Sequence, residues 1–186
     1  MQFELKFEEN RKLVTLFIDT DILSVETETE ETKLMPVSMA VLAPRYVGTW
    51  KEEEIKSFCE FYYGQKIIKP WGALFVSTLA RMCGIDSQIP LTDSTFKILT
   101  ALKNNKKLLD KGGYNLVQSG DIIFTASASG NLTNVGIIIN NDTASKELTV
   151  IKSNGIDRVE EIRYPYSSPR IYAIGLIDYI KIFERG

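Results

Sequence analysis

Apolar residues occupy every second position at the start of the chain, over Phe3–Phe7. A second apolar segment, Leu13–Ile18, follows the polar residues 9–11. Alternation of this kind predicts two half-buried strands joined as a β-hairpin. The acidic stretch Glu26–Glu31 keeps an alternating pattern of Thr and Glu, and we expect a solvated strand or loop there rather than a cation site.

The spacing becomes helical after a connecting segment. Val37–Val47 follows Pro36 and contains Pro44, and we expect an extended connector. Thr49 and Glu52 then form a capping box, in which each side chain satisfies the exposed backbone amide of the other residue. Apolar residues recur behind this box at helical spacing up to Gly64, at Ile55, Phe58, Cys59, Tyr62 and Tyr63, which predicts a first helix.

Two further helices and a series of strands complete the pattern. The helices are expected at Gly72–Cys83 and at about Ser94–Lys103, and Gly112-Gly113 breaks the chain after them. Strands are expected at Asp121–Ala126, Asn134–Asn140, Glu147–Lys152, Arg158–Arg163 and Ile171–Ile177. Helices followed by strands, without βαβ alternation, predict an α+β fold with an antiparallel sheet.

The length of 186 residues suggests one domain with an appendage. We place the boundary after the connector, with an N-terminal β-strand extension at residues 1–48 and the main domain at 49–186. The formal net charge of −2, without a Lys/Arg cluster, argues against nucleic-acid binding. The sequence contains no histidine, which excludes histidine-based acid–base catalysis, Ser-His or Cys-His activation and histidine metal ligands.

The two cysteines, Cys59 and Cys83, are too few for a disulfide framework and too widely spaced for a CxxC site. We expect buried thiols in a reducing compartment. The N-terminal segment shows no secretory signal, and no apolar run is long enough to span a membrane. The sequence therefore indicates synthesis in the cytoplasm, and no cofactor or metal site is expected.

Five segments, taken in order, resemble the signatures of one enzyme family. The segments are Pro70–Ser77, Ala80–Ile85, Ile89–Thr92, Gly120–Phe124 and Asn134–Ile138. They are similar to the CHAP and NlpC-type cell-wall amidases and endopeptidases, in which the first block reads W-C-A-x-F-V and the fifth reads H-V-G-I-V. The resemblance covers about residues 51 to 179, and it implies a papain-like fold.

The catalytic positions of that family are changed here. The resemblance places the nucleophilic cysteine at Gly72 and the histidine at Asn134, and an amide cannot act as a base near neutral pH. The third element of CHAP enzymes is an E-x-N stretch, which corresponds to Lys152-Ser153-Asn154, so that Asn154 is retained and the carboxylate is a lysine. We expect Gly72, Asn134 and Asn154 to surround a shallow cleft lined by Trp71, with Lys152 nearby; alternatively, Trp71 is a core residue.

Other residues offer weak substitutes for the missing nucleophile. Cys83 lies about 16 Å along the same predicted helix from Gly72, on its apolar face, and Cys59 lies on the apolar stripe of the preceding helix. Ser77 and Thr78 have no histidine to activate them, and Lys152 is a conceivable base without further support.

Two functions follow from the resemblance. The leading hypothesis is a catalytically inactive CHAP/NlpC-like domain that serves as a structural or binding module, in a phage tail, baseplate or tail-like particle, with protein partners and with peptidoglycan as a candidate ligand. The alternative is an active peptidoglycan hydrolase with a relocated nucleophile. The apolar residues of the N-terminal strands must be covered, and we expect one face to pack on the main domain and the exposed edge or the acidic segment to contact a partner.

Overall fold

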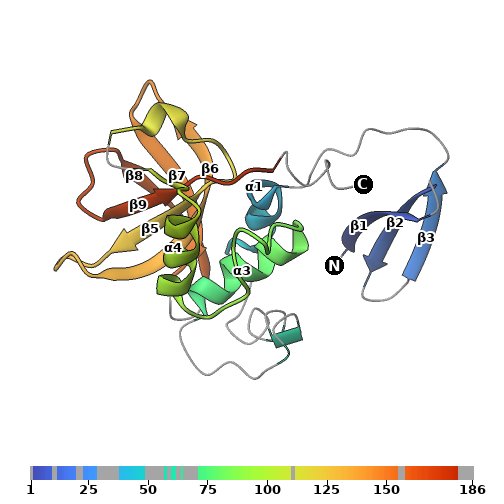
Figure 1. Cartoon of the computed structure of the whole chain (residues 1–186). Helices are drawn as coiled ribbons and strands as arrows, with labels where there is room; N and C mark the ends of the chain where they lie inside the picture. The colour runs from blue at the N-terminus through green and yellow to red at the C-terminus, as the bar shows by residue number, and fades with distance from the viewer. Residues whose placement is uncertain are drawn as a thin grey trace. The chain divides into compact units, whose positions relative to one another are not determined.

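The computed structural model divides the chain into two compact units, residues 1–35 (unit 1) and 36–186 (unit 2). Both are drawn in Figure 1. The residues that the structure describes are 2–9, 12–19, 23–28, 38–48, 57, 60–61, 64, 71–109, 112–154 and 158–179. Residues 36–48, which the sequence analysis placed with the N-terminal extension, belong to unit 2.

Unit 1 contains a three-stranded antiparallel sheet. Strand β1 (Gln2–Glu9) pairs with β2 (Lys12–Asp19), and β2 pairs with β3 (Leu23–Glu28). The predicted hairpin is therefore present, but a third strand extends it. The first half of the acidic segment, Glu26–Glu28, forms the end of β3.

Unit 2 begins with two short helical turns where the sequence analysis expected an extended connector. Helix α1 (Met39–Leu42) continues directly into the 3₁₀ helix η1 (Ala43–Tyr46). Met39, Ala43 and Tyr46 are at most 1% exposed, so this segment belongs to the core. The expectation was wrong because Pro44 stands in the first turn of η1, where a residue without an N–H breaks no helical hydrogen bond.

The helix predicted behind the capping box is described only in part. Residues 57, 60 and 61 are helical, and the Gly64 amide donates to the Glu60 carbonyl over 2.7 Å. Gly64 has a φ of +74°, as expected for the glycine that ends a helix. The Thr49–Glu52 capping box and Cys59 lie outside the described residues.

The other two predicted helices are confirmed. Helix α3 (Gly72–Met82) and helix α4 (Thr95–Asn104) match the expected ranges within two residues. The Ser94 side chain caps α4 by accepting a hydrogen bond from the Lys97 amide. On α3, every residue from 72 to 80 is buried, and the helix is therefore enclosed by protein over most of its length.

All five predicted strands are confirmed, and they belong to one antiparallel sheet. They are β5 (Ile122–Ala126), β6 (Leu132–Asp142), β7 (Glu147–Ser153), β8 (Val159–Pro165) and β9 (Ile171–Gly175). A short strand that was not predicted, β4 (Leu108–Leu109), completes the order β4-β9-β5-β6-β7-β8. Every pairing in this sheet is antiparallel, which confirms an α+β fold.

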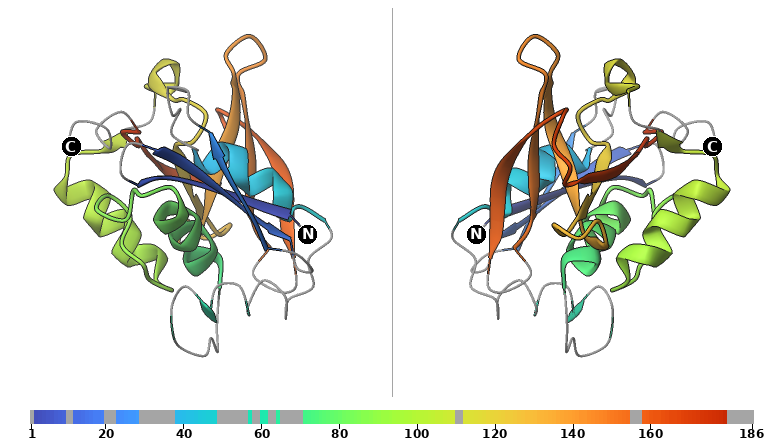
Figure 2. Two further views of the ribbon diagram at one scale, coloured as in Figure 1. Left: turned by 90° about the vertical axis from the view of Figure 1, so that its right-hand side faces the viewer. Right: turned by 90° about the vertical axis from the view of Figure 1, so that its left-hand side faces the viewer.

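The two faces of this sheet bury different sets of side chains. Ile122, Phe124 and Ile137 pack with the residues of α1, α3 and α4 in one cluster. Ile123, Ile138 and Val150 belong to a second cluster together with residues that precede β5 and β9. The hairpin between β6 and β7, orange in Figure 2, projects beyond the rest of the sheet in both views.

The segment Leu176–Tyr179, which follows β9, is hydrogen-bonded to several other parts of unit 2. The Leu176 amide donates to the Lys107 carbonyl, and the Asp178 amide donates to the side chain of Gln88. The Tyr179 hydroxyl donates to the Gly120 carbonyl over 2.8 Å and accepts from the Met39 amide over 3.4 Å. Gly120, with a φ of +100°, leaves room for this ring, since a Cβ there would lie 2.7 Å from it.

Asp121, just before β5, joins the same segment to the sheet. Its carboxylate accepts hydrogen bonds from the amides of Gln118 and Ile177 over 2.7 and 2.8 Å, and the residue is 4% exposed. Burial raises the pKa of the Asp121 carboxyl, and the two hydrogen bonds oppose this shift without cancelling it.

This raised pKa predicts a specific pH dependence of stability. The folded chain keeps the Asp121 proton to a higher pH than the unfolded chain, and this difference adds to the unfolding free energy. The added stability is complete below the unfolded carboxyl pKa of about 4. It is lost as the pH rises through the raised pKa of the folded chain. The unfolding free energy of the unmodified chain minus that of Asp121→Asn should therefore fall with rising pH in this window. Urea denaturation at a series of pH values measures it, and a difference that rises with pH would contradict the assignment.

Candidate functional site

The start of helix α3 is where the resemblance places the nucleophile of the CHAP and NlpC-type family. Gly72 is the first helical residue, and Trp71 occupies the N-cap position without a side-chain cap. The Phe75 amide donates to the Trp71 carbonyl over 2.8 Å and closes the first turn. This helix start is buried, because Trp71 is 2% exposed and Gly72 belongs to the buried residues of α3.

Gly72 lies directly against Asn134 of β6. A Cβ atom added at Gly72 would come within 2.4 Å of the Asn134 Oδ1, and its next neighbours would be the Asn134 Cγ and the Ser153 Cβ at 3.4 and 3.5 Å. The close atom is thus the end of a side chain rather than backbone. The structure therefore brings together the two positions that the family motifs align with its nucleophile and its base.

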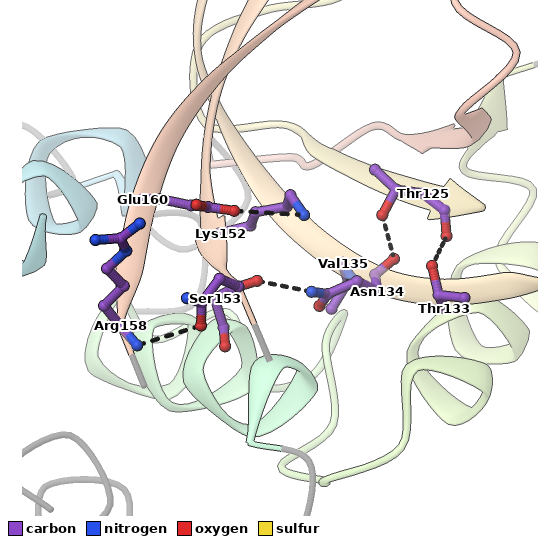
Figure 3. A network of polar contacts seen from close by, with 9 residues as sticks. Thr125, Thr133, Asn134, Val135, Lys152, Ser153, Arg158 and Glu160 are labelled. Carbon is purple, nitrogen blue, oxygen red and sulfur yellow. Dashed lines mark hydrogen bonds and ion pairs between the residues drawn. The ribbon is translucent and has the colours of Figure 1, made fainter. Parts of the chain in front are cut away.

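The side chain of Asn134 is held at both of its polar atoms. Its Nδ2 donates to the Ser153 carbonyl over 2.7 Å, and its Oδ1 accepts from the Val135 amide over 2.8 Å. Figure 3 shows the amide directed from the start of β6 toward Ser153 at the end of β7. Asn134 therefore joins two strands, and its oxygen fills the space beside Gly72.

Ser153 is a member of this site that the sequence analysis did not identify. It is fully buried; its carbonyl accepts the hydrogen bond from Asn134, and its Cβ would lie 3.5 Å from a Cβ added at Gly72. A lone serine carries no such signal in a single sequence, because its contribution here comes from its backbone carbonyl.

Lys152 lies on the other face of the sheet. It is two residues from Val150, which belongs to the second hydrophobic cluster, and side chains two residues apart in a strand share a face. Lys152 is paired with Gly136, where a Cβ would lie 2.8 Å from the Lys152 Cβ. The lysine therefore shares its face of the sheet with Gly136 and Val150.

The Lys152 ammonium lies 4.0 Å from the Glu160 carboxylate of β8, and its side chain is 13% exposed. Burial lowers the pKa of Lys152, and Glu160 opposes this shift. The pair is drawn in Figure 3. It joins β7 to β8 and does not place a base at the start of α3.

Asn154 closes the connection between β7 and β8. Its backbone N–H donates to the Arg158 carbonyl over 2.9 Å, and its side-chain Oδ1 accepts from the Arg158 backbone N–H over 3.2 Å. These contacts give Asn154 a structural role in the turn. It directly follows Ser153 in the chain.

Trp71 is a core residue rather than the lining of an open cleft. Its ring is 2% exposed and meets Phe75 edge-on, with ring centroids 6.3 Å apart. Phe75 in turn meets Tyr46 of η1 edge-on at 5.6 Å. The Trp71 Nε1 is buried without a hydrogen-bond partner within the described part of the chain.

The arrangement at the start of α3 lacks the groups for covalent hydrolysis. Gly72 has no side chain, and the Asn134 amide has neither a basic nitrogen nor a transferable proton at neutral pH. Among the residues described, no group of three or more His, Cys, Asp or Glu side chains could hold a metal ion. No helix in the described ranges is long and apolar enough to cross a membrane.

The contact between Gly72 and Asn134 predicts non-additive mutations. We expect Gly72→Ala to destabilise the protein by about 1–3 kcal/mol, because its Cβ meets the Asn134 oxygen. Asn134→Ala removes that oxygen, so the cost of Gly72→Ala should fall by at least ~1 kcal/mol in the Asn134→Ala background. Urea denaturation of the two single variants and the double variant measures the coupling.

Gly175→Ala is the matched control for this cycle. A Cβ at Gly175 would meet Leu102 and Ile122 instead, at 2.5 and 2.9 Å. Its destabilisation should be the same with Asn134 and with Ala at position 134. If Gly72→Ala also cost the same unfolding free energy with Asn and with Ala at position 134, the new Cβ would not meet the Asn134 side chain.

Cys83 provides a test of the relocated-nucleophile alternative. Burial raises the pKa of its thiol to about 12 from 9.0, which lowers the thiolate fraction at neutral pH by about a thousandfold. In a Cys59→Ser variant, which leaves Cys83 as the one thiol, iodoacetamide should react far more slowly with the folded than with the urea-unfolded protein. Alkylation at the same rate in both states would restore Cys83 as a candidate nucleophile.

Comparison of the chain with family models, with curated proteins and with solved structures finds no match. A function for the chain therefore has to be argued from its own residues and from the contact between Gly72 and Asn134.

Proposed function

We propose that unit 2 is a catalytically inactive relative of the CHAP and NlpC-type amidases, with a papain-like fold, that acts as a structural or binding module. The proposal is supported by the order of the five motif segments and by the antiparallel sheet that packs on a buried helix. In the resembling family, a helix start and a strand start face each other across the catalytic site. Gly72 and Asn134 occupy the same two kinds of position here.

The observation that carries the proposal is the fit of Asn134 against Gly72. The Asn134 oxygen occupies the space that a side chain at position 72 would enter, and its amide nitrogen is bonded to the neighbouring strand. A nucleophile and this asparagine conformation are mutually exclusive. The pair is therefore suited to stabilising the junction of α3, β6 and β7, and it is unsuited to forming a covalent intermediate.

The context that we propose is a larger assembly, such as a phage tail, a baseplate or a tail-like particle. Members of the resembling family act on cell walls, and an inactive member that retains its fold can bind peptidoglycan or hold protein partners. The acidic strands of unit 1 offer a docking element, because β1 and β3 are both edges of their sheet. An active hydrolase with a nucleophile elsewhere is the alternative that the experiment must exclude.

The proposed function is tested with the purified full chain and insoluble peptidoglycan. The unmodified protein should release no soluble fragments, because the start of α3 has neither nucleophile nor base. It should pellet with the wall if peptidoglycan is its ligand, and failure to pellet would leave protein assembly as the proposed role. Hydrolysis by the unmodified chain would overturn the proposal of an inactive domain.

A restored pair serves as the matched control for the hydrolysis assay. Gly72→Cys/Asn134→His replaces both positions with the family's residues, whereas Gly72→Cys alone supplies a thiol without a base. Release of wall fragments by the double variant, and not by the single variant, is the result expected from the family assignment. Equal inactivity of both folded variants would count against that assignment.

A further inference from the structure

Lys152 is a charged residue placed at one end of the second hydrophobic cluster of unit 2. In the register of the sheet it pairs with Gly136 of β6 and with Glu160 of β8, and Gly136 pairs in turn with Ile123 of β5. Paired residues share a face of the sheet, and Ile123 is a fully buried member of this cluster. Apart from Glu160, the cross-strand neighbours of the lysine therefore have an apolar side chain or none.

The ammonium group of Lys152 has few partners for a group so deeply buried. Its side chain is 13% exposed, and within the part of the chain that the structure describes its Nζ forms no hydrogen bond. The contact with the Glu160 carboxylate, drawn in Figure 3, measures 4.0 Å and is too long for a hydrogen bond. An ammonium carries three N–H donors, and a buried donor without an acceptor is destabilising. The position therefore offers donors that an additional acceptor can use.

A second cation, Arg170, lies near this ammonium. Arg170 precedes β9, and its carbonyl accepts from the Ala126 amide at the end of β5. Burial is the main cause that lowers the pKa of Lys152, and the charge of Arg170 lowers it further. The same charge opposes the rise that burial causes in the pKa of Tyr164. Arg170 is exposed, and it forms no ion pair with any residue that the structure describes.

Lys152, Arg170 and Glu160, here called the cationic cluster, carry one more positive than negative charge when all three are ionised. The Glu160 side chain is 30% exposed and Arg170 is exposed, so the cluster reaches the surface. A ligand with a single negative charge would balance the cluster. Glu160 would repel any further negative charge on that ligand.

We propose that the cationic cluster binds a carboxylate, which is held between the Lys152 ammonium and the Arg170 guanidinium. A carboxylate has two oxygens and one charge, so it can accept charge-assisted hydrogen bonds from both cations. A phosphate group carries more than one negative charge at neutral pH and is disfavoured by Glu160. The carboxylate belongs to a small organic acid or to the C-terminus of a peptide. The proposal does not depend on the assignment of unit 2 to the CHAP and NlpC-type family.

The experiment is an NMR titration of the isotope-labelled full chain with sodium acetate at neutral pH, with sodium chloride keeping the ionic strength constant. The backbone amides of Gly136, Lys152 and Arg170 should shift and reach saturation. Acetamide, which has the same shape without the charge, should leave them in place. The absence of a saturable shift with acetate, or an equal shift with acetamide, would overturn the proposal. Tighter binding of inorganic phosphate than of acetate would overturn the choice of a carboxylate.

Arg170→Gln and Arg163→Gln form a matched pair of variants for this titration. Both remove a guanidinium, but Arg163 is 70% exposed and lies 3.8 Å from Glu147. It is three residues from Glu160 in β8 and therefore lies on the other face of the strand. Arg170→Gln should raise the dissociation constant for acetate by roughly tenfold, because a hydrogen bond between two charged groups is lost. Arg163→Gln should leave it unchanged. Acetate binding that survives Arg170→Gln undiminished would contradict the site.

Two dipeptides distinguish the two sources of the carboxylate. Alanyl-alanine ends in a free carboxylate, and its C-terminal amide is the neutral control. Tighter binding of alanyl-alanine than of acetate assigns the site to a peptide C-terminus, whereas weaker binding assigns it to a small acid. If the amide bound as tightly as alanyl-alanine itself, the carboxylate would not be the group recognised, and the proposal would fail.

Discussion

Unit 2 depends on one constraint, which is that helix α3 is enclosed by protein over nine consecutive residues. A helix that is buried on every side can place no charge along that length, and none of residues 72–80 is charged. Of its two buried polar side chains, Ser77 bonds to both the amide and the carbonyl of Thr92, whereas the Thr78 hydroxyl has no hydrogen-bond partner within the described part of the chain. The elements that pack around this helix are β6 and β7 of the sheet and the helices α1 and α4.

The same enclosure explains the state of the site. The start of an enclosed helix has little room, and the available space beside Gly72 is taken by one oxygen atom of Asn134. That oxygen is not free to move away without cost, because the same side chain bonds to β7. The lack of a side chain at position 72 and the interstrand hydrogen bond of Asn134 are thus two parts of one packing solution.

The sequence analysis identified elements where a periodic pattern was long, as in α3, α4 and the strands β5 to β9. It failed where structure depends on distant contacts. The two-residue strand β4 has no periodicity of its own and exists because β9 lies beside it. The turns at Met39–Tyr46 were hidden by Pro44, whose place in the first turn of η1 depends on the burial of its neighbours. At the site, motif spacing placed Gly72 and Asn134 together, whereas the face of the sheet on which Lys152 lies follows from strand register.

The four residues after β9 have a consequence for the order in which unit 2 folds during synthesis. Leu176–Tyr179 bonds to residues near positions 39, 88, 107 and 121, so contacts that span up to 140 residues close last. Every element of the site leaves the ribosome before Leu176–Tyr179 does. A nascent chain that has emerged only to β9 lacks the hydrogen bonds by which Leu176–Tyr179 joins α1, the start of β5 and the end of α4. Folding that depends on such distant contacts is slow. Unit 2 therefore completes its fold only after Tyr179 has emerged.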